Sequence, residues 1–204
     1  MTLIQDTNDK ISDELNINYL ATGYISGRKG APLCLEADRY KSLHSRLNLV
    51  GSRGLEMMKG TASIHMHVGI RHISELVPLF ATLCEASISN DFGMQAERRD
   101  IWNNTDPSRC DFYCQRVHRD FGPQQLVSEL VRFTLNAEDL EKGTVFYRMN
   151  NIDFDSFMYH LTTIFTDVRL NVKGPTFELR TLDSLPIPAF EQKWLRFIEI
   201  LENL

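Results

Sequence analysis

The pattern of apolar and polar positions changes its period several times along the chain, which predicts helices mixed with strands. Over residues 39–58 apolar side chains recur at helical intervals, although Gly51 and Gly54 weaken the middle of this helix. Over 61–70 they alternate, which predicts a strand with one apolar and one polar face. The same criteria predict further helices over 73–84, 124–136, 153–164 and 190–204, and further strands over 144–149 and 176–182.

Two stretches lack a regular period. Residues 1–38 are interrupted by three glycines and Pro32, and we expect turns or an extended N-terminal arm or linker there. Residues 87–120 are rich in Asn, Asp, Arg and aromatic residues, which is typical of a long functional loop. Because strands and helices alternate irregularly, without a βαβ rhythm, the sequence predicts an α+β domain over 39–204 on an antiparallel sheet.

Length and composition narrow the class of protein. A chain of 204 residues can bury one sizeable core and fits one domain better than two. Its 22 Lys and Arg against 27 Asp and Glu give a formal charge of −5, which argues against a nucleic-acid binder. No apolar run approaches the roughly 20 residues of a membrane helix, and the first residues lack the pattern of a signal peptide. We therefore expect a cytoplasmic protein without nucleic-acid or membrane partners.

The cysteines suggest no redox or zinc chemistry. The four of them have no spacing typical of a zinc ribbon or a secreted disulfide framework. Cys110 and Cys114 lie four positions apart without paired histidines nearby, so reduced structural thiols are a better interpretation than a metal site.

Two pairs of polar residues lie on predicted strands. In His65-Met66-His67 the two imidazoles project to one face, where they could share a metal or an anionic group. In Glu178-Leu179-Arg180 the same geometry places a carboxylate beside a guanidinium, and a neighbouring strand could bring Glu178 beside His65 as a second metal ligand. The alternatives are a solvated strand face and a surface ion pair, both of which are common.

The predicted loop carries a third group of charged residues, which includes Arg98 and Arg109. Arginines suit bidentate contacts with phosphate oxygens, and a loop can gather several of them around one anion. The alternative is an ordinary charged loop. Glycine loops of the Walker or dinucleotide type are absent, so a nucleotide would have to be held in another way.

Several segments together resemble a known family. They resemble, in order, successive segments of the plant and bacterial type of glutamate–cysteine ligase: GTASIHMHVGI (60–70), PLFATLCEAS (78–87), ERRDIWNNTDPSR (97–109), HLTTIFTDVRL (160–170) and TFELRTLDSLP (176–186). The resemblance implies the C-terminal portion of such a carboxylate–amine ligase, on a partial version of the glutamine-synthetase-like fold. In that fold an antiparallel sheet lines a funnel that holds magnesium and ATP.

The resemblance also implies roles for single residues. His65 and Glu178 match metal-ligand positions, and His67 matches a neighbouring position that faces the substrate. Arg180 matches a catalytic arginine near the transferred phosphate.

Two arginines of the predicted loop receive roles in the same way. Arg98 and Arg109 match arginines that contact phosphate, and Arg98 matches a catalytic position as well. The implied reaction activates a carboxylate with ATP to an acyl phosphate, which an amine attacks to form an amide.

The sequence departs from the family in length and in its histidines. Family members are roughly twice as long, and their N-terminal half carries further metal-binding glutamates. We therefore expect amino-acid substrates, with glutamate as one candidate acid, and either a partner subunit that supplies the missing half or a homo-oligomer. The His-x-His form resembles other carboxylate–amine ligases, because the glutathione-forming branch tends to have amides there. A non-catalytic remnant or a regulatory or binding subunit of the same fold is the alternative.

Overall fold

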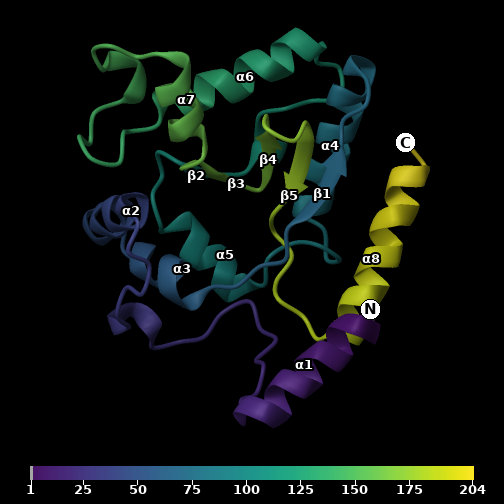
Figure 1. The fold of residues 1–204 in the computed structure, drawn as a ribbon. Helices are drawn as coiled ribbons and strands as arrows, with labels where there is room; N and C mark the ends of the chain where they lie inside the picture. The colour runs from purple at the N-terminus through teal and green to yellow at the C-terminus, as the bar shows by residue number, and fades with distance from the viewer. Residues whose placement is uncertain (1) are drawn as a thin grey trace.

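The computed structural model describes residues 2–204, and Figure 1 shows helices arranged around two small sheets. The α-helices are α1 (Thr2–Leu15), α2 (Asp38–Leu49), α3 (Gly54–Gly60), α4 (Leu76–Ser87), α5 (Ala96–Asn103), α6 (Pro123–Asn136), α7 (Phe154–Leu161) and α8 (Ile187–Glu202). The strands are β1 (Met66–Gly69), β2 (Cys110–Asp111), β3 (Phe165–Thr166), β4 (Val168–Asn171) and β5 (Thr176–Leu179). Short 3₁₀ helices are η1 (Arg28–Gly30), η2 (Ile73–Glu75), η3 (Tyr113–Gln115) and η4 (Phe146–Arg148).

The larger sheet joins segments that are far apart in the sequence. Its order is β1-β5-β4, so that β5 lies in the centre and pairs antiparallel with both neighbours. The smaller sheet is a parallel pair of β2 and β3. This architecture confirms the predicted α+β class and the antiparallel sheet.

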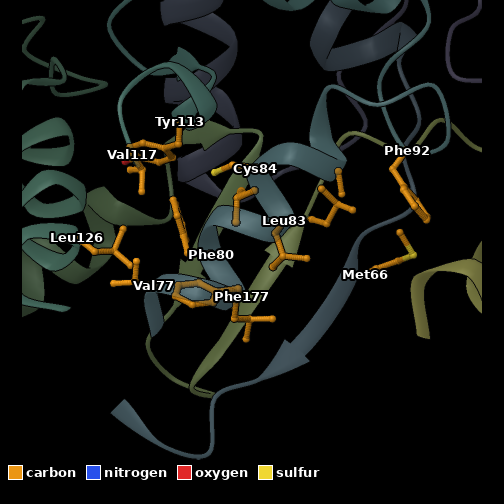
Figure 2. Packing of buried hydrophobic residues seen from close by; sticks show 14 of the residues in the cluster. Met66, Val77, Phe80, Leu83, Cys84, Phe92, Tyr113, Val117, Leu126 and Phe177 are labelled. Atoms are coloured by element: carbon orange, nitrogen blue, oxygen red, sulfur yellow. The ribbon is translucent and has the colours of Figure 1, made fainter. Parts of the chain in front are cut away.

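One face of the larger sheet forms the main core. Phe177 and Leu179 of β5 point toward α4 together with Met66 of β1, and all three are buried. Figure 2 shows Phe80 of α4 against Phe177, and their ring centroids lie 5.0 Å apart in an edge-to-face arrangement. Because side chains alternate along a strand, the residues between these apolar positions face the other side of the sheet, where the site lies.

The helix predicted over 39–58 is interrupted where its glycines indicated. It divides into α2 and α3, and Gly51 between them has a φ of 72°. This left-handed conformation suits glycine, and a side chain there would meet the carbonyl oxygen of Thr105 at 2.0 Å from the Cβ position. The remaining helix predictions agree with α4, α6, α7 and α8, and Asp153 caps α7 as its side chain accepts a hydrogen bond from Ser156 N–H.

Three predictions of local structure were wrong. The first 38 residues are not wholly irregular, because α1 precedes the glycines that suggested turns. The expected loop 87–120 contains α5 and β2. The expected strand 144–149 is η4 instead, since its backbone finds only one isolated bridge, between Val145 and Glu138. Within residues 2–204, no helix combines the length and apolarity that crossing a membrane requires.

Candidate functional site

A row of three charged or titratable side chains crosses the polar face of the larger sheet. His67 of β1 lies directly opposite Glu178 of β5, and Glu178 lies directly opposite Arg169 of β4. Directly paired residues of antiparallel strands share a face and lie close enough to interact. We call His67, Glu178 and Arg169 the cross-strand row.

The contacts in the row are asymmetric. Arg169 donates from Nε to Glu178 Oε2 at 2.9 Å and from Nη2 to Glu178 Oε1 at 3.0 Å. This is the bidentate geometry in which arginine binds carboxylates best. His67 Nε2 lies 3.5 Å from Glu178 Oε1, and its ring remains partly exposed. The row therefore has a bidentate ion pair at one end and a partly exposed imidazole at the other.

Electrostatics keep Glu178 ionised. Burial of the carboxyl would raise the pKa of Glu178, but the hydrogen bonds and the charge of Arg169 outweigh burial, so the pKa is lowered below its ordinary value. The charge of Arg180 acts in the same direction. At neutral pH Glu178 is a carboxylate that two guanidinium groups surround.

Arg180 is the least satisfied of these groups. Its Nη1 donates to the carbonyl oxygen of Ile164 at 3.2 Å, and its guanidinium lies 5.6 Å from the centre of the Phe165 ring. Its Nε is buried without a hydrogen-bond partner among the described residues, 3.7 Å from Glu178 Oε2. Burial, followed by the charge of Arg169, lowers the pKa of Arg180 to about 9. A buried donor that lacks an acceptor can bind an anion favourably, because its desolvation has already occurred.

His65 lies next to this cation. It precedes β1 by one residue and shares the alternation of His67, and its Nε2 lies 3.0 Å from Ser63 Oγ. Desolvation, followed by the charge of Arg180, lowers the pKa of His65 to about 4. The ring is therefore neutral at neutral pH, although the residue is accessible to solvent.

The geometry agrees in outline with the sequence hypothesis and differs in detail. The histidine pair and the Glu178–Arg180 pair do lie on paired strands and share a face. However, His67 rather than His65 lies directly opposite Glu178. Sequence reasoning gave Arg169 no role, although the alternation in Val168–Asn171 before the Gly174-Pro175 turn is typical of the first strand of a hairpin.

The structure places Arg109 in a buried network instead of an open loop. Its Nε donates to Asp106 Oδ2 at 2.8 Å, its Nη1 to Thr163 Oγ1 at 2.9 Å, and its Nη2 to the carbonyl oxygen of Glu138. Arg46 of α2 donates to the same Asp106 oxygen at 3.1 Å. All three guanidinium nitrogens of Arg109 thus have protein acceptors, and a phosphate contact would require exchanging one of them.

Arg98 is likewise buried, at the start of α5. It donates to the Asp183 carboxylate and to the carbonyl oxygen of Thr181, one residue beyond Arg180. Burial lowers the pKa of Arg98 more than the charge of Asp183 raises it. The structure therefore brings His65, His67, Glu178 and Arg180 together but leaves Arg98 and Arg109 supporting the surrounding chain.

The donors present do not form a magnesium site by themselves. Among residues 2–204, no group of three or more His, Cys, Asp and Glu side chains could hold a metal ion. Both oxygens of Glu178 accept hydrogen bonds from Arg169, and magnesium requires a nearly complete octahedron of oxygen ligands. One carboxylate between two guanidinium groups favours an anion on this face.

The site and fold together define an α+β chain with a cationic polar sheet face. The chain is 25% identical, over an alignment 224 positions long, to the chloroplastic glutamate–cysteine ligases of Solanum lycopersicum and Nicotiana tabacum. These alignments cover 88% of this chain but only 41% of each relative. No family model matches. The chain is thus distantly similar to plant glutamate–cysteine ligases, and it spans less than half of their length.

Proposed function

We propose that this chain is the phosphate-binding portion of an ATP-dependent carboxylate–amine ligase on a glutamine-synthetase-like fold. One observation carries the proposal: β1 and β5 place His65, His67, Glu178 and Arg180 on one sheet face. The segments that resembled the ligase family supply these residues, and the alignment with two such ligases covers most of the chain. A surface ion pair would not require a buried, partly unsatisfied guanidinium beside it.

The proposed reaction has two steps. An oxygen of the acid substrate attacks the γ-phosphorus of ATP, ADP leaves, and an acyl phosphate forms. The amine nitrogen then attacks the acyl carbon, the C–O bond to the phosphoryl group breaks, and an amide, phosphate and a proton result. An enzyme nucleophile is not required, so positioning and charge stabilisation supply the catalysis.

The chain contributes cations and an imidazole to this scheme. Arg180 offers its unpartnered Nε to a phosphoryl oxygen, and Arg169 keeps Glu178 ionised and oriented. His67 is the exposed end of the row and faces the substrate. Glutamate or a similar amino acid is the proposed acid, because the relatives are named glutamate–cysteine ligases.

Magnesium would need more ligands than this chain offers. Magnesium commonly neutralises phosphate charge in phosphoryl transfer. His65 and Glu178 are its proposed ligands here, and Glu178 would bind it only by giving up a hydrogen bond from Arg169. Because these two cannot complete its shell, a partner subunit, or a second copy, would supply further carboxylates. A cytoplasmic location stays a prediction, and the relatives' names place those proteins in the chloroplast.

A non-catalytic binding subunit of the same fold is the second candidate. The bidentate pair between Arg169 and Glu178 favours it, because a carboxylate held in this way is not free to bind a metal. Such a subunit would bind a nucleotide or a partner without turnover.

Isotope transfer tests the ligase proposal. The chain, alone and with candidate partner subunits, is incubated with ATP, magnesium, an amine panel and glutamate labelled with ¹⁸O in its carboxylates. We expect ADP release together with one ¹⁸O atom in the phosphate, because the carboxylate oxygen becomes the bridging oxygen of the acyl phosphate. ADP release without isotope transfer would contradict the acyl phosphate. Magnesium-dependent nucleotide binding without any ADP release would favour the binding subunit.

A further inference from the structure

The outer edge of β4 carries backbone groups that do not pair with another strand. Arg180 N–H donates to the carbonyl oxygen of Asp167 at 2.9 Å, which fixes the phase of the β4–β5 ladder. Since residues of an antiparallel pair alternate between bonding their partner and facing away, Arg169 and Asn171 bond to β5. Leu170 therefore directs its N–H and C=O away from the sheet.

Leu170 is the residue of this edge whose backbone N–H and C=O are available to a new strand. Val168 also faces outward, but its carbonyl oxygen accepts a hydrogen bond from Thr166 Oγ1 at 2.8 Å. Neither backbone group of Leu170 has a hydrogen-bond partner outside the strand ladder among the described residues. An unpaired outward residue in an edge strand is the point at which an extended segment can add to a sheet.

Two neighbouring hollows meet at this edge, and Met158, Leu161, Arg169, Leu170 and Val172 line both of them. The apolar hollow, of about 230 Å³, lies between α6, α7 and β4, and Leu130, Phe157 and Leu170 line it. The cationic hollow, of about 210 Å³, lies beside the end of β4, and Arg39, Arg169 and Lys173 line it. The residues that line the two hollows include no Asp or Glu.

Beyond their shared lining the two hollows differ, because one extends over apolar residues of α6 and the other extends toward Arg39 and Lys173. Leu170 belongs to the apolar face of the sheet, whereas Arg169 belongs to the polar face, together with the cross-strand row. An added strand would therefore turn apolar side chains toward the apolar hollow and anionic side chains toward the cationic hollow. Arg39 Nε is buried without a hydrogen-bond partner among the described residues, which provides a donor for a carboxylate.

We propose that the β4 edge binds an extended acidic partner segment, in which apolar and acidic residues alternate, as an added strand. This proposal goes beyond the proposed ligase function and depends on the edge alone. A second copy of this chain is a poor occupant, because a symmetric pairing of two β4 edges would bring cationic hollows together. A bound carboxylate beside Arg169 would extend the cross-strand row by one residue, on the side of Arg169 away from Glu178.

Amide hydrogen exchange measured by NMR tests the proposal without a nucleotide. The probe is a short peptide of alternating valine and glutamate, compared with a valine–lysine peptide and with a valine–glutamate peptide that carries a central proline. We expect the Leu170 amide to exchange rapidly in the free chain and to become protected by the valine–glutamate peptide alone. The Arg169 and Asn171 amides, which already bond to β5, serve as internal references.

Reversing the charge of one lysine in the cationic hollow tests whether that hollow binds the acidic side chains of the peptide. Lys173→Glu is expected to weaken binding of the valine–glutamate peptide by about threefold or more, whereas Lys142→Glu, at an exposed lysine outside both hollows, should leave it unchanged. A Leu170 amide that is protected in the free chain, equal binding of the lysine peptide, or protection by self-association would each overturn the proposal. Failure of the ATP experiments would leave this result unaffected.

Discussion

Methionine in place of Arg109 is expected to lower the free energy of unfolding by about 3–5 kcal/mol. Arg109 has no solvent exposure, and neither has its partner Asp106. The substitution removes donors from the Asp106 carboxylate, from Thr163 Oγ1 and from the Glu138 carbonyl oxygen, and it leaves all of these acceptors in place. Buried acceptors without donors carry the full penalty of desolvation.

The hydrogen bonds that Asp106 retains in this variant limit the loss in the free energy of unfolding. Arg46 still donates to Asp106 at 3.1 Å, and Ser108 N–H donates to the other oxygen of the same carboxylate at 2.9 Å. The Asp106 carboxylate therefore remains ionised, and we expect a destabilised native fold rather than a new one. Burial would raise the pKa of Asp106, but the hydrogen bond and charge of Arg109 lower it, so the substitution should move that pKa upward.

Urea unfolding measures this prediction against a surface control. Arg196→Met removes an exposed arginine that, within residues 2–204, forms an ion pair only with Glu199 one turn away in α8, and such exposed pairs contribute little to stability. If Arg109→Met were as stable as Arg196→Met, Arg109 would not be the buried structural cation described above, and its assignment as a phosphate ligand would be favoured.

Glutamine in place of Glu178 is expected to reduce ADP release by about 10²–10³-fold in the preparation that supports it. The amide has nearly the same shape as the carboxylate but no charge, and its nitrogen cannot accept the bond that Arg169 donates to one oxygen. The bidentate pair then becomes a single hydrogen bond. The substitution also removes the carboxylate that is the proposed metal ligand.

A change in rate must be separated from a loss of fold. Glu178 lies on the central strand, and its neighbours Phe177 and Leu179 hold the core, so the Glu178→Gln chain should retain its circular dichroism spectrum. Glu202→Gln, at an exposed residue of α8, is the matched control and should retain full activity. Unchanged turnover in Glu178→Gln, with the control also unchanged, would show that the carboxylate has no part in the reaction.

The strand residues of the site could be predicted, because their signal is local. Alternation alone placed His65 with His67 and Glu178 with Arg180, and the register between β1 and β5 then followed from burial of Met66 and Leu179 on the opposite face. A one-residue slip would have exposed those apolar side chains. The partner of each charge could not be predicted, because a single sequence does not specify which strands pair.

Arg98 and Arg109 show most clearly that the partners of charged residues cannot be predicted from one sequence. Arg98 and Arg109 lie in a polar segment, and their composition alone does not distinguish a phosphate loop from a buried ion network. The deciding contacts, with Asp183 and Thr163, come from residues 85 and 54 positions away in the sequence. Arg169 received no role because no strand was predicted between the helix over 153–164 and the strand over 176–182, although the alternation in β4 offered one.

Titration of the chain with ATP and magnesium, followed through the histidine ring resonances, tests the central claim that the row and its neighbours face the phosphates. We predict that the resonances of His65 and His67 shift on binding, while those of the exposed His72 and His118, which lie outside the row, do not. Shifts at His72 or His118 with none at His65 and His67, or an absence of binding, would contradict the account.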